Sequence, residues 1–290
     1  MTASLIDGNQ IAGQIKAEVA AQVSALKRKG VNPCLAVILV GDDPASSTYV
    51  SAKQRVSREI GIRSIQHHFA EDTAESSLVD LIGELNQDAS VHGILVQLPL
   101  PPHISEYNIV SAIAPQKDVD GFHPYNAGRL VTGLDTFIPC TPLGVSEMIS
   151  KSGIEASGKH VVIIGRSNIV GKPLMNLLVQ KADQANATVT LCHSRTRDIK
   201  VHTLQADILV AAIGRPGFVT SDMVKPGAVV IDVGINRIKE KGKTRLVGDV
   251  DFDEVRKVAS KITPVPGGVG PMTVGILMQN VAKAAVLSSA

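Results

Sequence analysis

The sequence alternates short runs of β-branched residues with longer segments of helical periodicity. This rhythm is typical of βαβ units and of a mostly parallel sheet covered by helices. We expect strands at 34–40, 93–98, 160–164, 188–192, 208–213 and 228–233, and helices at 8–29, 48–60, 77–88, 143–152, 173–182 and 273–287. The chain is therefore predicted to be an α/β protein with a doubly wound nucleotide-binding sheet in its second half.

The length of the chain and one segment rich in Gly and Pro indicate two lobes. A chain of 290 residues corresponds to about two domains of roughly 150 residues. The segment 121–142 is rich in Gly, Pro and Asn without a clear period, which favours a hinge. We predict an N-terminal α/β catalytic domain formed by residues 1–139 and 271–290, to which the last helix returns. A Rossmann-type domain is predicted at 140–270.

Composition argues against several classes of protein. Lys and Arg number 29 against 27 Asp and Glu, and aromatic residues make up 3%. The chain thus offers neither the basic stripe nor the stacking platform of a nucleic-acid binder. No HxxxH or HExxH spacing supports a metal site, so none is predicted.

The cysteines and the N-terminus favour a cytoplasmic protein. Cys34, Cys140 and Cys192 are scattered, without CxxC spacing, which argues against a disulfide framework and fits a reducing compartment. The first residues lack the basic region of a signal peptide. Every apolar run is far shorter than the roughly 20 residues that cross a bilayer, so no membrane association is predicted.

Two glycines, Gly165 and Gly171, lie between a predicted strand and a predicted helix. A helix N-terminus attracts phosphate, and glycine lets a ligand approach the backbone. Five residues separate the two glycines, and Pro173 stands where a P-loop has Ser or Thr, which excludes a kinase or ATPase loop. Ser167 replaces the middle glycine of the dinucleotide pattern. An ordinary βα turn remains the alternative.

The residues after the strand 188–192 favour NADP over NAD. An NAD site usually ends this strand with an acid that binds the ribose 2′-hydroxyl. Here Cys192 is followed by His, Ser194 and Arg195 instead. Arg166 in the glycine loop adds a bidentate phosphate donor. The alternative is that Arg195 and its neighbours form a solvated face.

Several polar residues of the first lobe are candidates for proton transfer. Tyr49 and Lys53 stand four apart on a predicted helix, so they share one face. A lysine desolvated in an apolar environment can serve as an acid or a base, although a surface lysine packed on a tyrosine ring is an alternative. Gln97 ends a buried run, at the strand edge where ligands bind or where a strand is simply capped. Asp118 and Asp120 form either an exposed turn or a ligand-orienting carboxylate.

Six blocks of sequence, in order along the chain, closely resemble one family. They are YVSAK (49–53), VQLPLP (96–101), KDVDGFHP (117–124), PCTP (139–142), GRSNIVGKP (165–173) and PVPGGVGPMT (264–273). Taken alone, the Pro- and Gly-rich block 264–273 is either a loop that a ligand approaches closely or a plain connector. Together the blocks resemble the bifunctional methylenetetrahydrofolate dehydrogenase/methenyltetrahydrofolate cyclohydrolases over essentially the whole chain.

The resemblance implies two consecutive reactions of one-carbon metabolism, which serves purine, methionine and histidine biosynthesis. Methylenetetrahydrofolate is oxidised with NADP to the methenyl cation, which water opens to 10-formyltetrahydrofolate. It also implies a homodimer joined through the nucleotide lobes.

The resemblance further implies site residues. Lys53 would be the central proton-transfer residue, Tyr49 and Gln97 would shape its environment, and the Asp120 carboxylate would bind the pterin. The implied NADP contacts are Gly165, Arg166, Ser167, Ser194, Ile235 and Thr273. The implied folate contacts are Tyr49, Lys53, Val96, Gln97, Leu98, Asp120, Pro266, Gly267, Gly270 and Pro271.

Two other functions compete with this reading. Another two-lobed NADP-dependent dehydrogenase, of the shikimate or amino-acid type, would share the second lobe but has no reason to carry the first-lobe blocks. An NADP-sensing regulator that had lost its chemistry should also have lost Lys53, Gln97 or Asp120, and all three are present.

Overall fold

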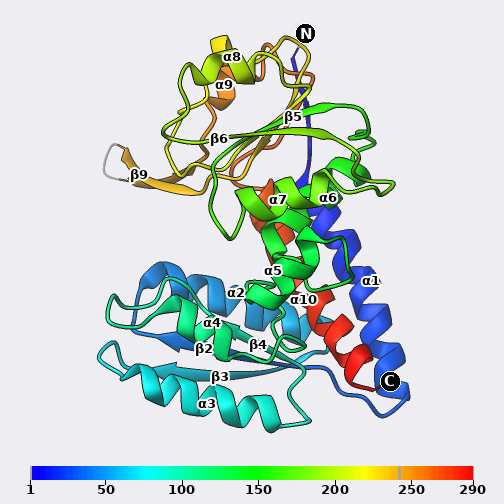
Figure 1. Cartoon of the computed structure of the whole chain (residues 1–290), viewed down its shortest axis with the longest axis vertical. Helices are drawn as coiled ribbons and strands as arrows, with labels where there is room; N and C mark the ends of the chain where they lie inside the picture. The colour runs from blue at the N-terminus through cyan, green and yellow to red at the C-terminus, as the bar shows by residue number, and fades with distance from the viewer. Residues whose placement is uncertain (1, 241–242, 290) are drawn as a thin grey trace. The chain divides into compact units, whose positions relative to one another are not determined.

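The computed structural model describes residues 2–240 and 243–289, and their contacts form two compact units (Figure 1). Unit 1 contains residues 2–12 and 139–273, and unit 2 contains residues 13–138 and 274–289. The helices α1 (Gly8–Arg28) and α10 (Val269–Ser288) each contribute residues to both units. Within the described residues, no helix combines the length and apolarity needed to cross a bilayer.

Unit 2 is built on a parallel sheet of three strands in the order β3 (Arg63–Phe69), β2 (Cys34–Val40) and β4 (Gly93–Val96). Every residue of β2 is buried. Alternate residues of a strand face opposite sides, so both faces of this central strand are covered, as in other parallel sheets. The remaining helices of the unit are α2 (Pro44–Ile60), α3 (Glu75–Gln87), α4 (Glu106–Ala112) and α5 (Pro124–Val131).

Helix α2 begins four residues before the position expected from the sequence. The Asp43 carboxylate accepts a hydrogen bond from Ser46 N at 2.7 Å, and Pro44 occupies the first turn, where its missing N–H costs nothing. The helix ends at Gly61, whose φ of 84° is left-handed. Both signals fix the helical frame in which Tyr49 and Lys53 lie.

Unit 1 contains a parallel sheet of six strands. Their order is β1 (Ser4–Leu5), β11 (Lys261–Ile262), β8 (Val229–Asp232), β7 (Ile208–Ala211), β5 (His160–Ile164) and β6 (Thr188–Cys192). From β5 the chain passes to β6 on one side and then to β7 on the other, so the strand order reverses at β5. Such a reversal marks the place where doubly wound sheets bind nucleotides.

Unit 1 contains further elements outside this sheet. They are α6 (Cys140–Lys151), α7 (Gly171–Leu178), α8 (Ile199–Thr203), the 3₁₀ turn Ser221–Met223, α9 (Phe252–Val255) and an antiparallel hairpin of β9 (Asn236–Glu240) and β10 (Lys243–Val247). The predicted α/β class with a doubly wound sheet is confirmed.

The structure differs from the expected organisation at several places. Residues 2–12 group with unit 1 rather than with the first lobe, because β1 pairs with β11. The segment 121–142, expected as a hinge, contains α5 and the start of α6. Strand β3 and the β9–β10 hairpin were not expected. Strand β3 has the polar sequence RSIQHHF, which lacks the apolar run of a buried strand, because its residues are half-buried or exposed.

Candidate functional site

Lys53 and Gln97 are in direct contact in unit 2. Lys53 Nζ donates to Gln97 Oε1 at 2.9 Å, and only 8% of Lys53 is exposed. Gln97 Nε2 donates to Leu98 O at 2.7 Å, so the amide oxygen faces the lysine. Helix α2 supplies Lys53, and Gln97 directly follows β4 at its carboxyl end. Lys53 Nζ is thus held in place by a neutral acceptor rather than by a carboxylate.

Tyr49 lies one helical turn before Lys53 and is 39% exposed. Residues four apart share a helix face, so an accessible phenol lies on the same side of α2 as the buried lysine. After β4 the implied folate contacts differ in accessibility: Val96 is buried at 5% exposure, and Leu98 is half-buried.

Asp118 and Asp120 have different environments. Asp118 is 1% exposed, and its carboxylate accepts hydrogen bonds from Phe122 N at 3.3 Å, His123 N at 2.8 Å and Asn126 Nδ2 at 2.8 Å. Burial raises the pKa of Asp118. Asp120, two residues later, is half-buried. Asp118 therefore shapes the turn, and Asp120 is the carboxylate of this turn that a ligand can reach.

The turn that carries Asp120 is also held from helix α10. Asn280, 3% exposed, donates through Nδ2 to Val119 O at 2.8 Å and to Ile138 O at 3.2 Å. No sequence motif pointed to Asn280, because its partners lie more than a hundred residues away in the chain.

In unit 1 the glycine loop packs closely against neighbouring backbone. Gly165, at φ 127°, follows β5, and a Cβ there would lie 2.0 Å from Ala212 O. A Cβ at Gly171 would lie 1.9 Å from Gly165 O. Ser167 Oγ accepts a hydrogen bond from Val170 N at 3.1 Å, just before α7 begins. The loop thus brings a helix N-terminus to the point where the strand order reverses, which suits a phosphate.

Exposed polar side chains surround this loop. Arg166 is exposed, and so are Ser194 and Arg195 after β6. His193 closes the turn that carries them, since its N donates to Thr196 Oγ1 at 2.9 Å and its Nδ1 accepts from Arg195 N at 3.1 Å. The end of β6 thus offers the Ser194 hydroxyl and the Arg195 guanidinium group, and the glycine loop offers the guanidinium group of Arg166. Since no carboxylate lies among residues 193–197, these groups fit the 2′-phosphate of NADP.

A second group of implied contacts lies after β8 and at the start of α10. Ile235 is 43% exposed, and a Cβ at Gly270 would lie 3.3 Å from Ile235 Cδ1. Thr273 Oγ1 lies 3.1 Å from Thr141 Oγ1. Pro271 follows Gly270 in the helix, whereas Pro266 and Gly267 belong to the preceding loop, with Gly267 at φ 103°.

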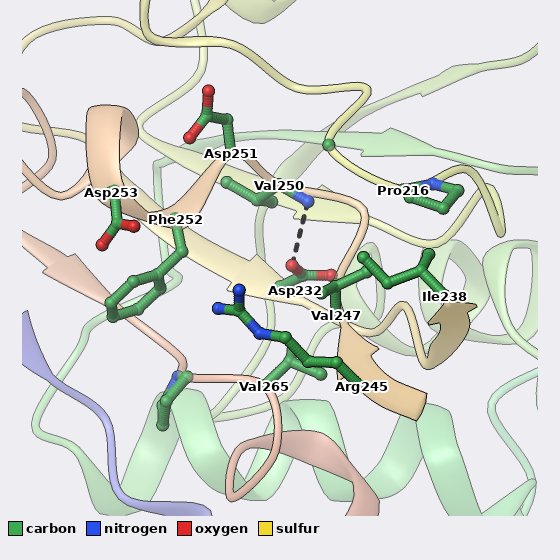
Figure 2. A pocket seen from close by; sticks show the side chains of 13 residues that line it. Pro216, Asp232, Ile238, Arg245, Val247, Val250, Asp251, Phe252, Asp253 and Val265 are labelled. Atoms are coloured by element: carbon green, nitrogen blue, oxygen red, sulfur yellow. Dashed lines mark hydrogen bonds between the residues drawn. The ribbon is translucent and has the colours of Figure 1, made fainter. Parts of the chain in front are cut away.

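Two carboxylates that sequence reasoning missed are buried in unit 1. Asp232 is 3% exposed and Asp249 is fully buried. Asp232 borders a cavity of about 380 Å³ that Arg245 and Phe252 also line (Figure 2). Burial raises the pKa of Asp232 to about 7. Neither position forms a motif, because most of the backbone N–H groups that bind these carboxylates are distant in sequence.

Comparison with known proteins identifies relatives over the full length. The tetrahydrofolate dehydrogenase/cyclohydrolase catalytic domain model matches residues 6–120, and the NAD(P)-binding domain model of the same name matches residues 139–289. The bifunctional protein FolD of Syntrophus aciditrophicus (strain SB) is 55% identical over 291 residues, which cover 100% of this chain and 99% of that protein.

Solved structures agree with these matches. The methylenetetrahydrofolate dehydrogenase-cyclohydrolase of Trypanosoma brucei, complexed with NADP cofactor and inhibitor, superposes with a TM-score of 0.94 at 40% identity, covering 100% of this chain and 99% of that one. Shikimate 5-dehydrogenase from Listeria monocytogenes has a TM-score of 0.50 at 15% identity, covering 88% of this chain and 91% of that one, and shares the fold alone.

Proposed function

The chain belongs to the tetrahydrofolate dehydrogenase/cyclohydrolase family, and from this premise we propose that it catalyses two consecutive reactions on a one-carbon folate. It oxidises 5,10-methylenetetrahydrofolate to 5,10-methenyltetrahydrofolate with NADP, and then hydrolyses this product to 10-formyltetrahydrofolate. The observation that carries the proposal is the hydrogen bond from Lys53 Nζ to Gln97 Oε1, in a chain with full-length relatives.

We propose Lys53 as the residue that moves protons in the hydrolysis. Water adds to the methenyl carbon, which forms a C–O bond. One proton of that water is released, and Lys53 in its neutral form accepts it. The carbon–N5 bond then breaks, and the carbinol O–H proton ends on N5. A neutral amide as partner suits this role, since a carboxylate would favour the charged form of the lysine.

We assign the folate ring chiefly to residues of unit 2. The Asp120 carboxylate accepts two parallel N–H bonds from the pterin edge, and the Tyr49 ring offers an accessible apolar face. The other proposed folate contacts are Val96 and Leu98 in unit 2, and Pro266, Gly267, Gly270 and Pro271 in unit 1. Of these, Val96 would contribute through its backbone, because its side chain is buried.

We assign NADP to unit 1, where it supplies the hydride acceptor of the first reaction. Gly165 and Ser167 bring backbone and hydroxyl groups to its phosphates, while Arg166 and Ser194 bind the 2′-phosphate. Ile235 and Thr273 border the nicotinamide.

The experiment that tests the function is a paired assay on one preparation. NADPH formation from methylenetetrahydrofolate is followed by absorbance, and methenyl hydrolysis is followed separately without NADP. We expect both activities. A preparation that forms no NADPH contradicts the dehydrogenase activity. A preparation in which the methenyl compound hydrolyses only at its uncatalysed rate contradicts the cyclohydrolase activity.

The proposal also covers assembly and location. We propose a homodimer joined through unit 1, which light scattering at several concentrations would test. A cytoplasmic location is proposed because Cys34, Cys140 and Cys192 are not joined in disulfides, as is usual in reducing compartments. Fractionation of the source cells would test it.

A further inference from the structure

Two buried carboxylates join the loops at the carboxyl edge of the unit 1 sheet. Asp232 ends β8, and Asp249 lies two residues after β10. Their exposed fractions are 3% and 0%. The proposed reactions assign no role to either residue, although a buried carboxylate is expensive unless hydrogen bonds satisfy it.

Asp249 binds two separate segments of the chain. Its Oδ2 accepts hydrogen bonds from Ile213 N at 2.7 Å and from Gly214 N at 2.9 Å. Its Oδ1 accepts from Arg215 N at 2.9 Å and from Asn236 Nδ2 at 2.9 Å. One carboxylate thus satisfies three consecutive backbone donors of the loop after β7 and ties that loop to the segment after β8.

Asp232 holds Asp249 in position. Its Oδ1 accepts hydrogen bonds from Gly234 N and from Asp249 N, both at 2.9 Å. Its Oδ2 accepts from Val250 N at 3.0 Å, the bond drawn in Figure 2. The backbone that carries Asp249 is therefore fixed to the end of β8.

Two glycines let the backbone close over these carboxylates. A Cβ at Gly234 would lie 2.3 Å from Asp249 Oδ1, and a Cβ at Gly248 would lie 1.8 Å from Asp232 Oδ2. Atoms cannot approach so closely, so only glycine fits at either position. The arrangement therefore depends on two aspartates and two glycines together.

Both tied segments lie at the edge where a doubly wound sheet binds its dinucleotide. Residues 213–215 follow β7, and Ile235 directly precedes Asn236 after β8. We propose that Asp249, anchored by Asp232, is a positioning residue for NADP: it fixes the 213–215 loop and Ile235 in the shape that the cofactor binds. This inference rests on the proposed function, and it assigns residues that make no contact with the cofactor themselves.

The test is Asp249→Asn. An amide keeps one acceptor oxygen and turns its NH₂ toward N–H donors, so two of the four hydrogen bonds are lost. We expect the NADP(H) Kd, measured by NADPH fluorescence, to rise at least about tenfold, since two lost hydrogen bonds exceed 1.4 kcal/mol together. Methenyl hydrolysis without NADP should stay within about twofold of wild type. Asp253→Asn, the same change at an exposed residue of the same cavity, is the control.

A second variant keeps the test decisive if Asp249→Asn does not fold. Asn236→Ala removes one of the four donors and leaves both carboxylates in place, and it should raise the NADP(H) Kd a few-fold with hydrolysis unchanged. An unchanged Kd in the folded variant overturns the inference, and so does a parallel loss of hydrolysis and cofactor affinity, which a merely structural role would produce. A wild-type enzyme that reduces no NADP contradicts the proposed function instead, which keeps the two failures distinct.

Discussion

At the scale of single residues, the Lys53–Gln97 contact separates the two proposed activities. Lys53→Met replaces a buried amine by an apolar side chain of similar length. We expect methenyl hydrolysis to fall at least about 100-fold, the usual loss when a positioned acid or base is removed, while the NADP Kd changes little. Parallel rate and NADPH-fluorescence measurements check this. Lys29→Met, at an exposed position, is the control, and hydrolysis that survives in Lys53→Met contradicts the assigned role.

The choice between NADP and NAD is also decided by individual side chains. Replacing Arg166 and Ser194 together by Ala removes the proposed 2′-phosphate donors. The ratio of kcat/KM for NADP to that for NAD should fall about tenfold or more, because hydrogen bonds to charged groups contribute about 1.5–3 kcal/mol each. Arg197→Ala, an exposed arginine a few residues further on, should leave the ratio unchanged. An unaltered ratio in the double variant would place the 2′-phosphate elsewhere.

At the scale of elements, the turn 118–123 depends on a buried carboxylate. Asp118→Asn turns an amide NH₂ toward backbone donors, which costs about 1–3 kcal/mol of stability, and it loosens the turn that carries Asp120. We expect the KM for methylenetetrahydrofolate to rise more than kcat falls. Steady-state kinetics and urea unfolding test this, with Asp72→Asn on the exposed surface as control. A loss of stability without any change in KM would limit Asp118 to a structural role.

The turn between β5 and α7 depends on close backbone approach. In Gly165→Ala the new Cβ meets Ala212 O at 2.0 Å, so the loop must move and NADP affinity should be lost with a lowered Tm. Gly158→Ala isolates the other penalty, because its φ is 70° and a Cβ there meets nothing within 4 Å. That control should lose only about 1–2 kcal/mol for the left-handed conformation and keep its NADP affinity. Equal effects in both variants would contradict the explanation.

Sequence reasoning succeeded for elements whose pattern is local. Strands β2, β5 and β6 appear within the expected bounds, because short runs rich in β-branched and aliphatic residues favour strands. Helix α5 was missed since its segment is short and begins at Pro124 after a Gly-containing turn. For the candidate site, the spacing of Tyr49 and Lys53 indicated a shared face. The contribution of Asn280 and Asp249 depends on partners distant in sequence, so no local pattern could indicate it.

At the scale of the whole molecule, stability should carry a pH signature from Asp232. Its pKa is raised to about 7 from the usual 3.8 by burial. Between these two values the folded chain holds a proton that the unfolded chain has lost. The contribution of this proton to the free energy of unfolding is therefore complete below about pH 4, and it disappears as the pH rises through about 7.

Some other carboxyl groups change the stability in the opposite direction as the pH changes. Hydrogen bonds lower the pKa of Asp207 and Asp222, so their contribution is lost as the pH falls. A comparison isolates Asp232: the stability difference between wild type and Asp232→Asn, measured by urea unfolding, should shrink from pH 4 toward neutrality. A difference that stays constant over this range would show that Asp232 is ionised throughout.

The interleaving of the two units along the chain has a consequence for the order in which they are completed during synthesis. Unit 2 begins at residue 13, yet it includes residues 274–289, whereas unit 1 is complete once residue 273 has been made. Asn280, which supports the turn of Asp120, belongs to that last stretch. At roughly 5–20 residues per second, the early part of unit 2 waits many seconds for its final helix. Of the two units, unit 2 is therefore completed after unit 1, although most of its residues are made before residues 139–273 of unit 1.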